Sequence, residues 1–324
     1  MPNFSAFIPE IHHGVSPGFV DVLIKTQRAE LFTGLMKFCH PSNENLVFAF
    51  VDGVERELYR SNQSTTEKIP RSDWSKTLFS SDSSVGLLPL SLEAMRVVQV
   101  AHEAPVLRVE QMNLDSLELL DQADKWELDP EPSVVHVHTS QADSFYLCAN
   151  RSNLVLEEIV FVGGKVQFSI SNSSFAQSLP QGTHQVTRYV SVRDHAAWHG
   201  YELRMAFMPL MRMLMQRFSE LAGRGLTERL GEQLSSWARG GGWNMTFSGN
   251  GVINREYFDS VDEAVNAYKD LLGRFQMETG RAIGPRMVEN ISREVLFKLD
   301  ASTRELLMHY LFTHYGLDGV VVKA

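Results

Sequence analysis

The sequence predicts an α+β protein with two modules, each built on an antiparallel hairpin meander, and a helical bundle that follows the second meander. Three observations favour this fold. Strand-like runs flank Asp52-Gly53, and similar runs flank Gly163-Gly164. Both dipeptides suit the tight turns of hairpins. From about residue 199, apolar residues instead recur every three or four positions, which is the period of a helix.

The first module is expected over residues 1–127. Ser16 can cap a short helix, and Pro17 fits its first position. This helix is expected to bury one apolar face, formed by Phe19, Val22, Leu23 and Thr26. The other elements follow in chain order: a strand over 31–38, a hairpin over 46–60, a polar loop or lid over 61–84, and helices near 91–103 and 113–126.

The second module is expected over residues 128–324, after a linker rich in proline and acidic residues at 127–133. Its strands are expected over 134–171 and its bundle over 199–316. Two helix starts carry the spacing of a capping box, Ser260 with Glu263 and Ser302 with Glu305. The last residues, 320–323, would form either a short strand or a frayed end.

The two hairpins suggest a diverged tandem duplication. FVDGV at 50–54 matches FVGGK at 161–165, at an offset of 111 residues. The alternative is that the match is a general feature of hairpins, because any apolar strand that leads into a glycine turn has this pattern.

Composition argues against several classes of function and location. The chain has 30 basic and 39 acidic residues, a formal charge of -9, and no basic stripe, so nucleic-acid binding is not expected. The N-terminus lacks the pattern of a signal peptide, and no apolar run is long enough for membrane insertion. Cys39 and Cys148 are expected to be reduced thiols, which indicates a cytoplasmic protein.

Two histidine pairs are candidate metal ligands. His195 and His199 are four residues apart and could share a helix face, with Asp194 or Glu202 as further ligands. However, Ala196 stands where a metalloprotease has its glutamate, so a structural role is the alternative. His136 and His138 alternate along a strand and point to one face, but no carboxylate or thiolate stands at a fixed spacing from them. The alternative for this pair is a half-exposed strand face that binds no metal.

No cofactor is expected. GGKV at 163–166 and GNGV at 249–252 complete neither the phosphate-loop nor the dinucleotide pattern, and no G-x-S-x-G motif occurs. The methionine-rich run at 205–218 is interpreted as bundle core, because its apolar stripe has a helical period. Its alternative is a surface for a partner or for self-association, formed by Met205, Met208, Met211 and Met215.

Residues 19–38 and 46–60 resemble the PatA N-terminal-like domain family, known also as PATAN or DUF4388-type. The matching residues are Phe32, Thr33, Gly34 and Leu35, then Phe48, Phe50, Asp52 and Gly53. The resemblance covers about residues 1–60 and reaches toward 127 in its helical part. It implies a bacterial signalling accessory domain that contacts other proteins and carries no chemistry of its own.

These observations lead to three hypotheses for function. The first is a non-enzymatic bacterial regulatory adaptor that acts through other signalling proteins or through self-association. The second is a metal-dependent enzyme or sensor that uses His195 and His199. The third is a small-molecule sensor whose strands and 61–84 lid enclose a ligand.

Overall fold

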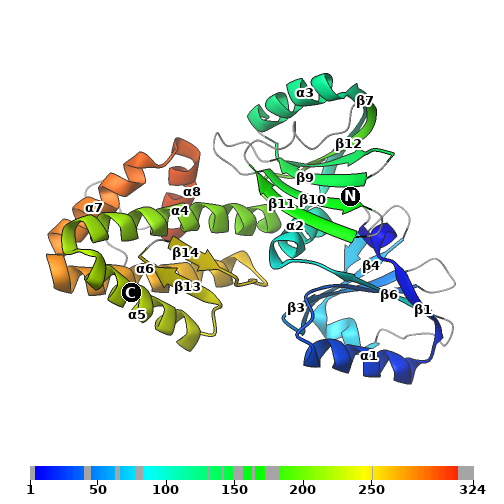
Figure 1. The fold of residues 1–324 in the computed structure, drawn as a ribbon, viewed down its shortest axis with the longest axis horizontal. Helices are drawn as coiled ribbons and strands as arrows, with labels where there is room; N and C mark the ends of the chain where they lie inside the picture. The colour runs from blue at the N-terminus through cyan, green and yellow to red at the C-terminus, as the bar shows by residue number, and fades with distance from the viewer. Residues whose placement is uncertain are drawn as a thin grey trace. The chain divides into compact units, whose positions relative to one another are not determined.

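The computed structural model describes residues 4–39, 45–62, 66–76, 83–129, 131–140, 142–148, 156–162, 165–171, 182–249 and 251–312. The chain divides into two compact units, Met1–His195 and Ala196–Ala324 (Figure 1). Antiparallel sheets and helices make up the first unit and a helical bundle makes up most of the second, so the predicted α+β class is confirmed. Within the described residues, no helix has both the length and the apolar character that crossing a membrane requires.

The first unit contains two antiparallel sheets of six strands each. The first sheet has the order β1-β6-β2-β3-β4-β5, and the second has the order β11-β10-β9-β8-β12-β7. The strands of the first sheet are β1 (Glu10–Val15), β2 (Gly34–Cys39), β3 (Asn45–Val51), β4 (Val54–Ser61), β5 (Thr66–Lys68) and β6 (Ser83–Pro89). The strands of the second are β7 (Val106–Asp115), β8 (Ser133–His138), β9 (Ala142–Cys148), β10 (Leu156–Val162), β11 (Lys165–Ser171) and β12 (Thr183–Ser191).

One face of each sheet is covered by a helix of its own copy. The helix α1 (Pro17–Ala29) packs on the first sheet, and α3 (Ser116–Leu128) packs on the second (Figure 1). The Ser16 hydroxyl accepts a hydrogen bond from the Phe19 N–H, so the predicted cap of α1 is confirmed. Two short 3-10 helices complete the unit, η1 (Phe4–Phe7) and η2 (Arg71–Lys76).

The two sheets have the same topology. In each, a first strand precedes the helix, a meander of four strands follows, and the last strand returns between the first and the second. Equivalent elements begin at similar offsets. Three pairs are 99 residues apart, Pro17 and Ser116, Gly34 and Ser133, and Thr66 and Lys165, and the other four pairs begin 96 to 102 residues apart. This agreement supports a tandem duplication.

The duplication has a different alignment from the expected one. FVDGV spans the turn between β3 and β4, whereas FVGGK runs from β10 to β11. The equivalent of β4 is β10, so these two turns do not correspond and the offset of 111 is wrong. Gly163 and Gly164 themselves lie outside the described residues.

The helix α2 (Leu92–Glu103) joins the two copies. It contacts β3 and β5 of the first sheet and β10 of the second, and most of its residues are buried. The boundary expected between residues 127 and 128 instead falls inside the second sheet, because β12 pairs with β7 on one side and β8 on the other. The expected linker is anchored there, since the buried Arg188 guanidinium donates to Asp129 Oδ2 at 2.7 Å.

The pKa of Asp129 reflects this anchoring. Burial raises the pKa of the carboxyl group, but the Glu131 backbone N–H and the Arg188 guanidinium lower it further than burial raises it. The net effect is a pKa below the usual value, so the carboxylate stays ionised beside Arg188.

Two details of the first unit differ from expectation. The face of α1 that meets the sheet contains Val20 and Gln27, which are buried, and Leu23 and Ile24, which are partly buried against the core. The expectation is therefore confirmed for Leu23, whereas Phe19 and Val22 are exposed. Adjacent apolar stripes run along this helix, and the periodicity alone could not decide which one meets the strands. The segment expected as a loop or lid at 61–84 also contains structure: β5, η2 and the start of β6.

Besides β5 and β6, three further strands of the first unit were not predicted. β1, β7 and β12 are rich in polar residues, and about half of the side chains of β7 are exposed. Each of them is stabilised by pairing with strands distant in sequence rather than by a strong apolar pattern.

The second unit is the predicted helical bundle. Its helices are α4 (Ala196–Ala222), α5 (Arg224–Gly240), α6 (Val261–Ile283), α7 (Pro285–Lys298) and α8 (Ala301–Leu311), with a hairpin of β13 (Met245–Ser248) and β14 (Gly251–Asn254). At the centre of its core, the rings of Phe207 and Tyr268 stack with centroids 4.0 Å apart. Residues 320–323 lie outside the described part of the chain.

The two predicted capping boxes have different outcomes. The Ser260 hydroxyl does accept from the Glu263 N–H at the start of α6. The cap at Ser302 is wrong, because Asp300 accepts from the Thr303 N–H and Ser302 lies inside α8. Ser and Asp are both good caps, so the spacing of Ser302 and Glu305 could not exclude the residue two positions earlier.

His102 in α2 provides a test of this fold. Its ring contacts Phe4 and Tyr59, and within the described residues neither of its ring nitrogens has a hydrogen-bond partner. Burial lowers the pKa of His102 to about 3. In the unfolded chain this imidazole regains its ordinary pKa, so between pH 6.5 and 3 the unfolded state binds a proton that the folded state does not.

We therefore expect the free energy of unfolding of the first unit to fall as the pH is lowered through this window. His102 should account for a loss of about 2 kcal/mol between pH 7 and pH 5. His102→Phe should remove this part of the pH dependence, as measured by urea unfolding at both pH values. The exposed His13→Asn should retain it. Equal pH dependence in wild type and His102→Phe would contradict the prediction.

Candidate functional site

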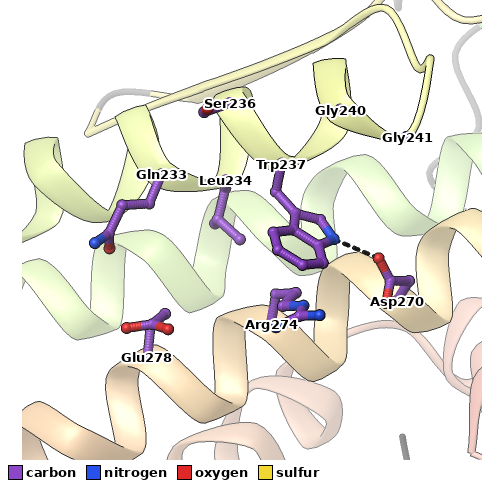
Figure 2. A pocket seen from close by; sticks show the side chains of 9 residues that line it. All are labelled: Gln233, Leu234, Ser236, Trp237, Gly240, Gly241, Asp270, Arg274 and Glu278. Carbon is purple, nitrogen blue, oxygen red and sulfur yellow. Dashed lines mark hydrogen bonds between the residues drawn. The ribbon is translucent and has the colours of Figure 1, made fainter.

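The candidate functional site is a cavity of about 580 Å³ on the helical bundle, between α5 and α6. Figure 2 shows the side chains around it. Its lining residues come from these two helices and the turn after α5: Gln233, Leu234, Ser236, Trp237, Gly240, Gly241, Asp270, Arg274 and Glu278. This volume lies within the roughly 300 to 1,000 Å³ of small-molecule sites.

Trp237 is the central residue of the cavity. It projects from α5 toward α6 (Figure 2), yet 40% of its surface remains exposed. Its Nε1–H donates a hydrogen bond to Asp270 Oδ2 at 2.5 Å, which fixes the plane of the indole ring. Leu234, three residues before it, is buried and lies beneath the cavity.

Three charged residues of α6 line the opposite side. Asp270, Arg274 and Glu278 are spaced by four, so they lie along one face of the helix. The Arg274 guanidinium carbon is 3.3 Å from the centroid of the Trp237 ring. In the described part of the chain, the structure records neither a hydrogen bond nor an ion pair of Arg274. Its N–H groups are therefore available to an acceptor in the cavity.

The position of α5 is fixed by close contact with the β13–β14 hairpin. A side chain at Gly231 would place its Cβ 2.9 Å from the Phe247 carbonyl oxygen, so only glycine allows this approach. One turn later, the Ser235 hydroxyl accepts from the Phe247 N–H at 2.8 Å and donates to the Gly231 carbonyl at 2.7 Å. These contacts hold the face that carries Trp237 in a defined position.

The predicted pair His195 and His199 does not share a helix. The helix α4 begins at Ala196, so His195 precedes it, whereas His199 lies in its first turn. His199 Nδ1 is hydrogen-bonded to the Tyr310 hydroxyl at 2.6 Å. Among the described residues, neither histidine belongs to a group of three side chains placed to hold a metal ion.

The four predicted methionines lie on α4 and mostly face the bundle. Met211 and Met215 are buried in the core, Met208 packs against it, and Met205 is half-buried. Their flexible side chains fill the space between the helices, which agrees with the interpretation of this run as core.

The other pair, His136 and His138, has a carboxylate partner that the sequence did not reveal. Asp143 lies on the neighbouring strand, and Asp143 Oδ1 is 2.8 Å from one ring nitrogen of each histidine. The signal that could have found it is the short hairpin between β8 and β9, whose register places residue 143 opposite residue 138.

Sequence reasoning also missed the cavity. An aromatic residue at the edge of the apolar stripe of α5 was visible, but Asp270 and Arg274 come from a helix more than thirty residues away. Comparisons with family models, with curated proteins and with solved structures find no match to this chain. A proposal for function therefore rests on the residues and their geometry.

Two glycines of α5 test how the site is positioned. Gly231→Ala should lower the free energy of unfolding of the second unit by about 1 to 3 kcal/mol, because its methyl group would force α5 and β13 apart. Gly225→Ala is the matched control, since a Cβ there meets no atom within 4 Å. It should stabilise α5 by about 0.5 to 1 kcal/mol, the usual advantage of alanine over glycine in a helix. Urea unfolding measures both, and a neutral Gly231→Ala would show that the close approach is not required.

Proposed function

We propose that the protein is a non-enzymatic regulatory adaptor whose helical unit binds a segment of a partner protein in the cavity at Trp237. The observation that carries this proposal is a half-exposed tryptophan held by Asp270 and stacked on Arg274. Tryptophan and arginine dominate the binding energy of many protein interfaces. Both side chains are already oriented here, which lowers the entropy lost on binding.

The lining defines the chemistry of the segment. The exposed part of the indole and Leu234 favour an apolar or aromatic side chain. Arg274 favours a carboxylate or a backbone carbonyl, since a guanidinium donates to planar oxygen acceptors. Glu278 is paired with Arg281 at 2.8 Å, and Asp270 accepts from Trp237, so both carboxylates already have partners beside the cavity.

The first unit is the proposed regulatory part. The resemblance of residues 19–60 to the PatA N-terminal-like family supports a bacterial signalling role, and the repeat supports a second domain of the same type. The proposed compartment is the cytoplasm, which agrees with the absence of a disulfide bond at Cys39 and Cys148 in the described residues.

Peptide selection tests this proposal. Random peptides displayed on phage are selected on the immobilised full-length chain, after depletion on the Trp237→Ala variant. A selected peptide, made synthetically, should bind the wild type at least about 30-fold more tightly than Trp237→Ala in calorimetry, the effect of a hot-spot residue. Arg274→Gln should weaken binding of peptides that carry a carboxylate.

Phe297→Ala is the matched control for this experiment. Phe297 is a 61% exposed aromatic residue of α7 with Arg304 over its ring, but it does not line the cavity. The Phe297→Ala variant should bind the selected peptide as the wild type does. If no peptide is enriched by the depletion, or if the selected peptides bind Trp237→Ala equally well, the cavity is not a partner site.

A small-molecule sensor is the second candidate, favoured by the volume of the cavity. In that case a metabolite panel should contain a compound that raises the melting temperature of the wild type and not that of Trp237→Ala. Thermal-shift measurement with this panel tests the second candidate. A compound that occupies the cavity should also compete with any selected peptide. A shift equal in wild type and Trp237→Ala would exclude this cavity as its site.

A further inference from the structure

A second site lies in the first unit, on the hairpin of β8 and β9, and does not depend on the proposed function. His136 and His138 are two residues apart on β8, so their side chains point to the same face. The register pairs His138 with Asp143 on β9, which brings its carboxylate to that face as well. Each of the three side chains can offer one ligand atom to a metal ion, and these three atoms lie within 4.8 Å of one another.

This face of the hairpin is separate from the core of the second sheet. Val135 and Val137 point the other way and pack beneath α3. The ring of His136 stacks on Phe145, with centroids 4.4 Å apart and planes 8° apart, and Phe7 approaches His136 edge-on. These contacts fix the plane of the His136 imidazole and direct its Nε2 toward Asp143.

The spacing of the three side chains suits a metal ion. Asp143 Oδ1 is 2.8 Å from His136 Nε2 and 2.8 Å from His138 Nδ1. Ligand atoms about 2.1 Å from a shared ion are separated by roughly 3 to 3.4 Å in octahedral or tetrahedral geometry. Small side-chain movements would therefore bring these three atoms around one ion.

We propose that His136, His138 and Asp143 bind a divalent first-row transition metal ion, with Zn²⁺ as the representative, through two imidazole nitrogens and one carboxylate oxygen. This ligand set is typical of zinc and iron(II) sites. The side chains of His136 and Asp143 are 21% and 23% exposed and that of His138 is 53% exposed, so an ion can enter from solvent. Three protein ligands leave at least one coordination position for water or an external ligand.

Among its described residues, the first copy of the repeat has no such set. At the offset of 99 residues, the positions of His136 and His138 are occupied by Lys37 and Cys39. Lys37 is cationic and cannot bind a metal in that form, and burial raises the pKa of the Cys39 thiol. The two copies share their topology, so the histidine pair is a property of the second copy rather than of the fold.

Isothermal calorimetry with Zn²⁺ alone tests the proposal. The full-length protein is first treated with a chelator and then titrated at pH 7.5. We expect one equivalent of Zn²⁺ to bind, and saturation to raise the melting temperature of the first unit. His138→Asn and Asp143→Asn should each weaken binding at least about tenfold, since loss of even an outer-shell partner costs that much.

The Asp143→Asn variant distinguishes a metal site from a cluster whose only role is to hydrogen-bond the side chains of β8 and β9. The asparagine side-chain oxygen can still accept from both imidazoles, but it lacks the negative charge of the carboxylate. A variant that remains folded by circular dichroism and loses Zn²⁺ therefore supports coordination. His138→Asn removes the most exposed of the three groups, so it should leave the fold intact.

Two histidine pairs elsewhere serve as controls. The double variant His12→Asn/His13→Asn removes exposed imidazoles beside Glu10, and His195→Asn/His199→Asn removes the pair first considered as metal ligands. Both should bind Zn²⁺ as the wild type does. The proposal is overturned if the wild type binds less than one equivalent, if Asp143→Asn and His138→Asn retain its affinity, or if either control variant loses the binding.

Discussion

The register of β8 is the constraint on which the second sheet depends. This strand pairs with β9 on one side and β12 on the other, and both pairings are antiparallel. A slip by one residue would turn Val135 and Val137 out of the core and His136 and His138 into it. The same register therefore sets the apolar core beneath α3 and the polar cluster on the opposite face. A slip of this register would therefore disrupt the apolar core and the proposed metal site together.

The two copies of the repeat have the same fold but different residues on one face of the sheet. The helix-facing positions remain apolar in both copies, with Met36 and Phe38 in the first and Val135 and Val137 in the second. The opposite positions changed from Lys37 and Cys39 to His136 and His138. The core positions keep their apolar character, although Met36 and Phe38 are larger than Val135 and Val137, because a core accepts other hydrophobic residues when its neighbours repack. The two copies thus share their architecture and differ in the chemistry of one face.

The sequence was informative wherever the physics is local. Ser16, the Asp52-Gly53 turn and the periodic helices of the bundle predicted their elements, because caps, turns and apolar stripes act over a few residues. The polar strands β1, β7 and β12 were missed, since their stability comes from partners far along the chain. The candidate sites could not be predicted from the sequence for the same reason. Asp143 acquires its role only when strand pairing places it beside His138, which the sequence had indicated. Asp270 acquires its role only when helix packing places it beside Trp237, which the sequence had not indicated.

The close contact between α5 and the β13–β14 hairpin has a kinetic consequence. Gly231 and Ser235 join the helix to backbone atoms of Phe247, so the wall that carries Trp237 does not have to be assembled when a ligand arrives. Association with a preformed wall is limited by the orientation of the encounter rather than by a conformational step. Ligands of this cavity would then enter at similar rates and differ chiefly in residence time. A signal read through such a site would be encoded in how long the complex lasts.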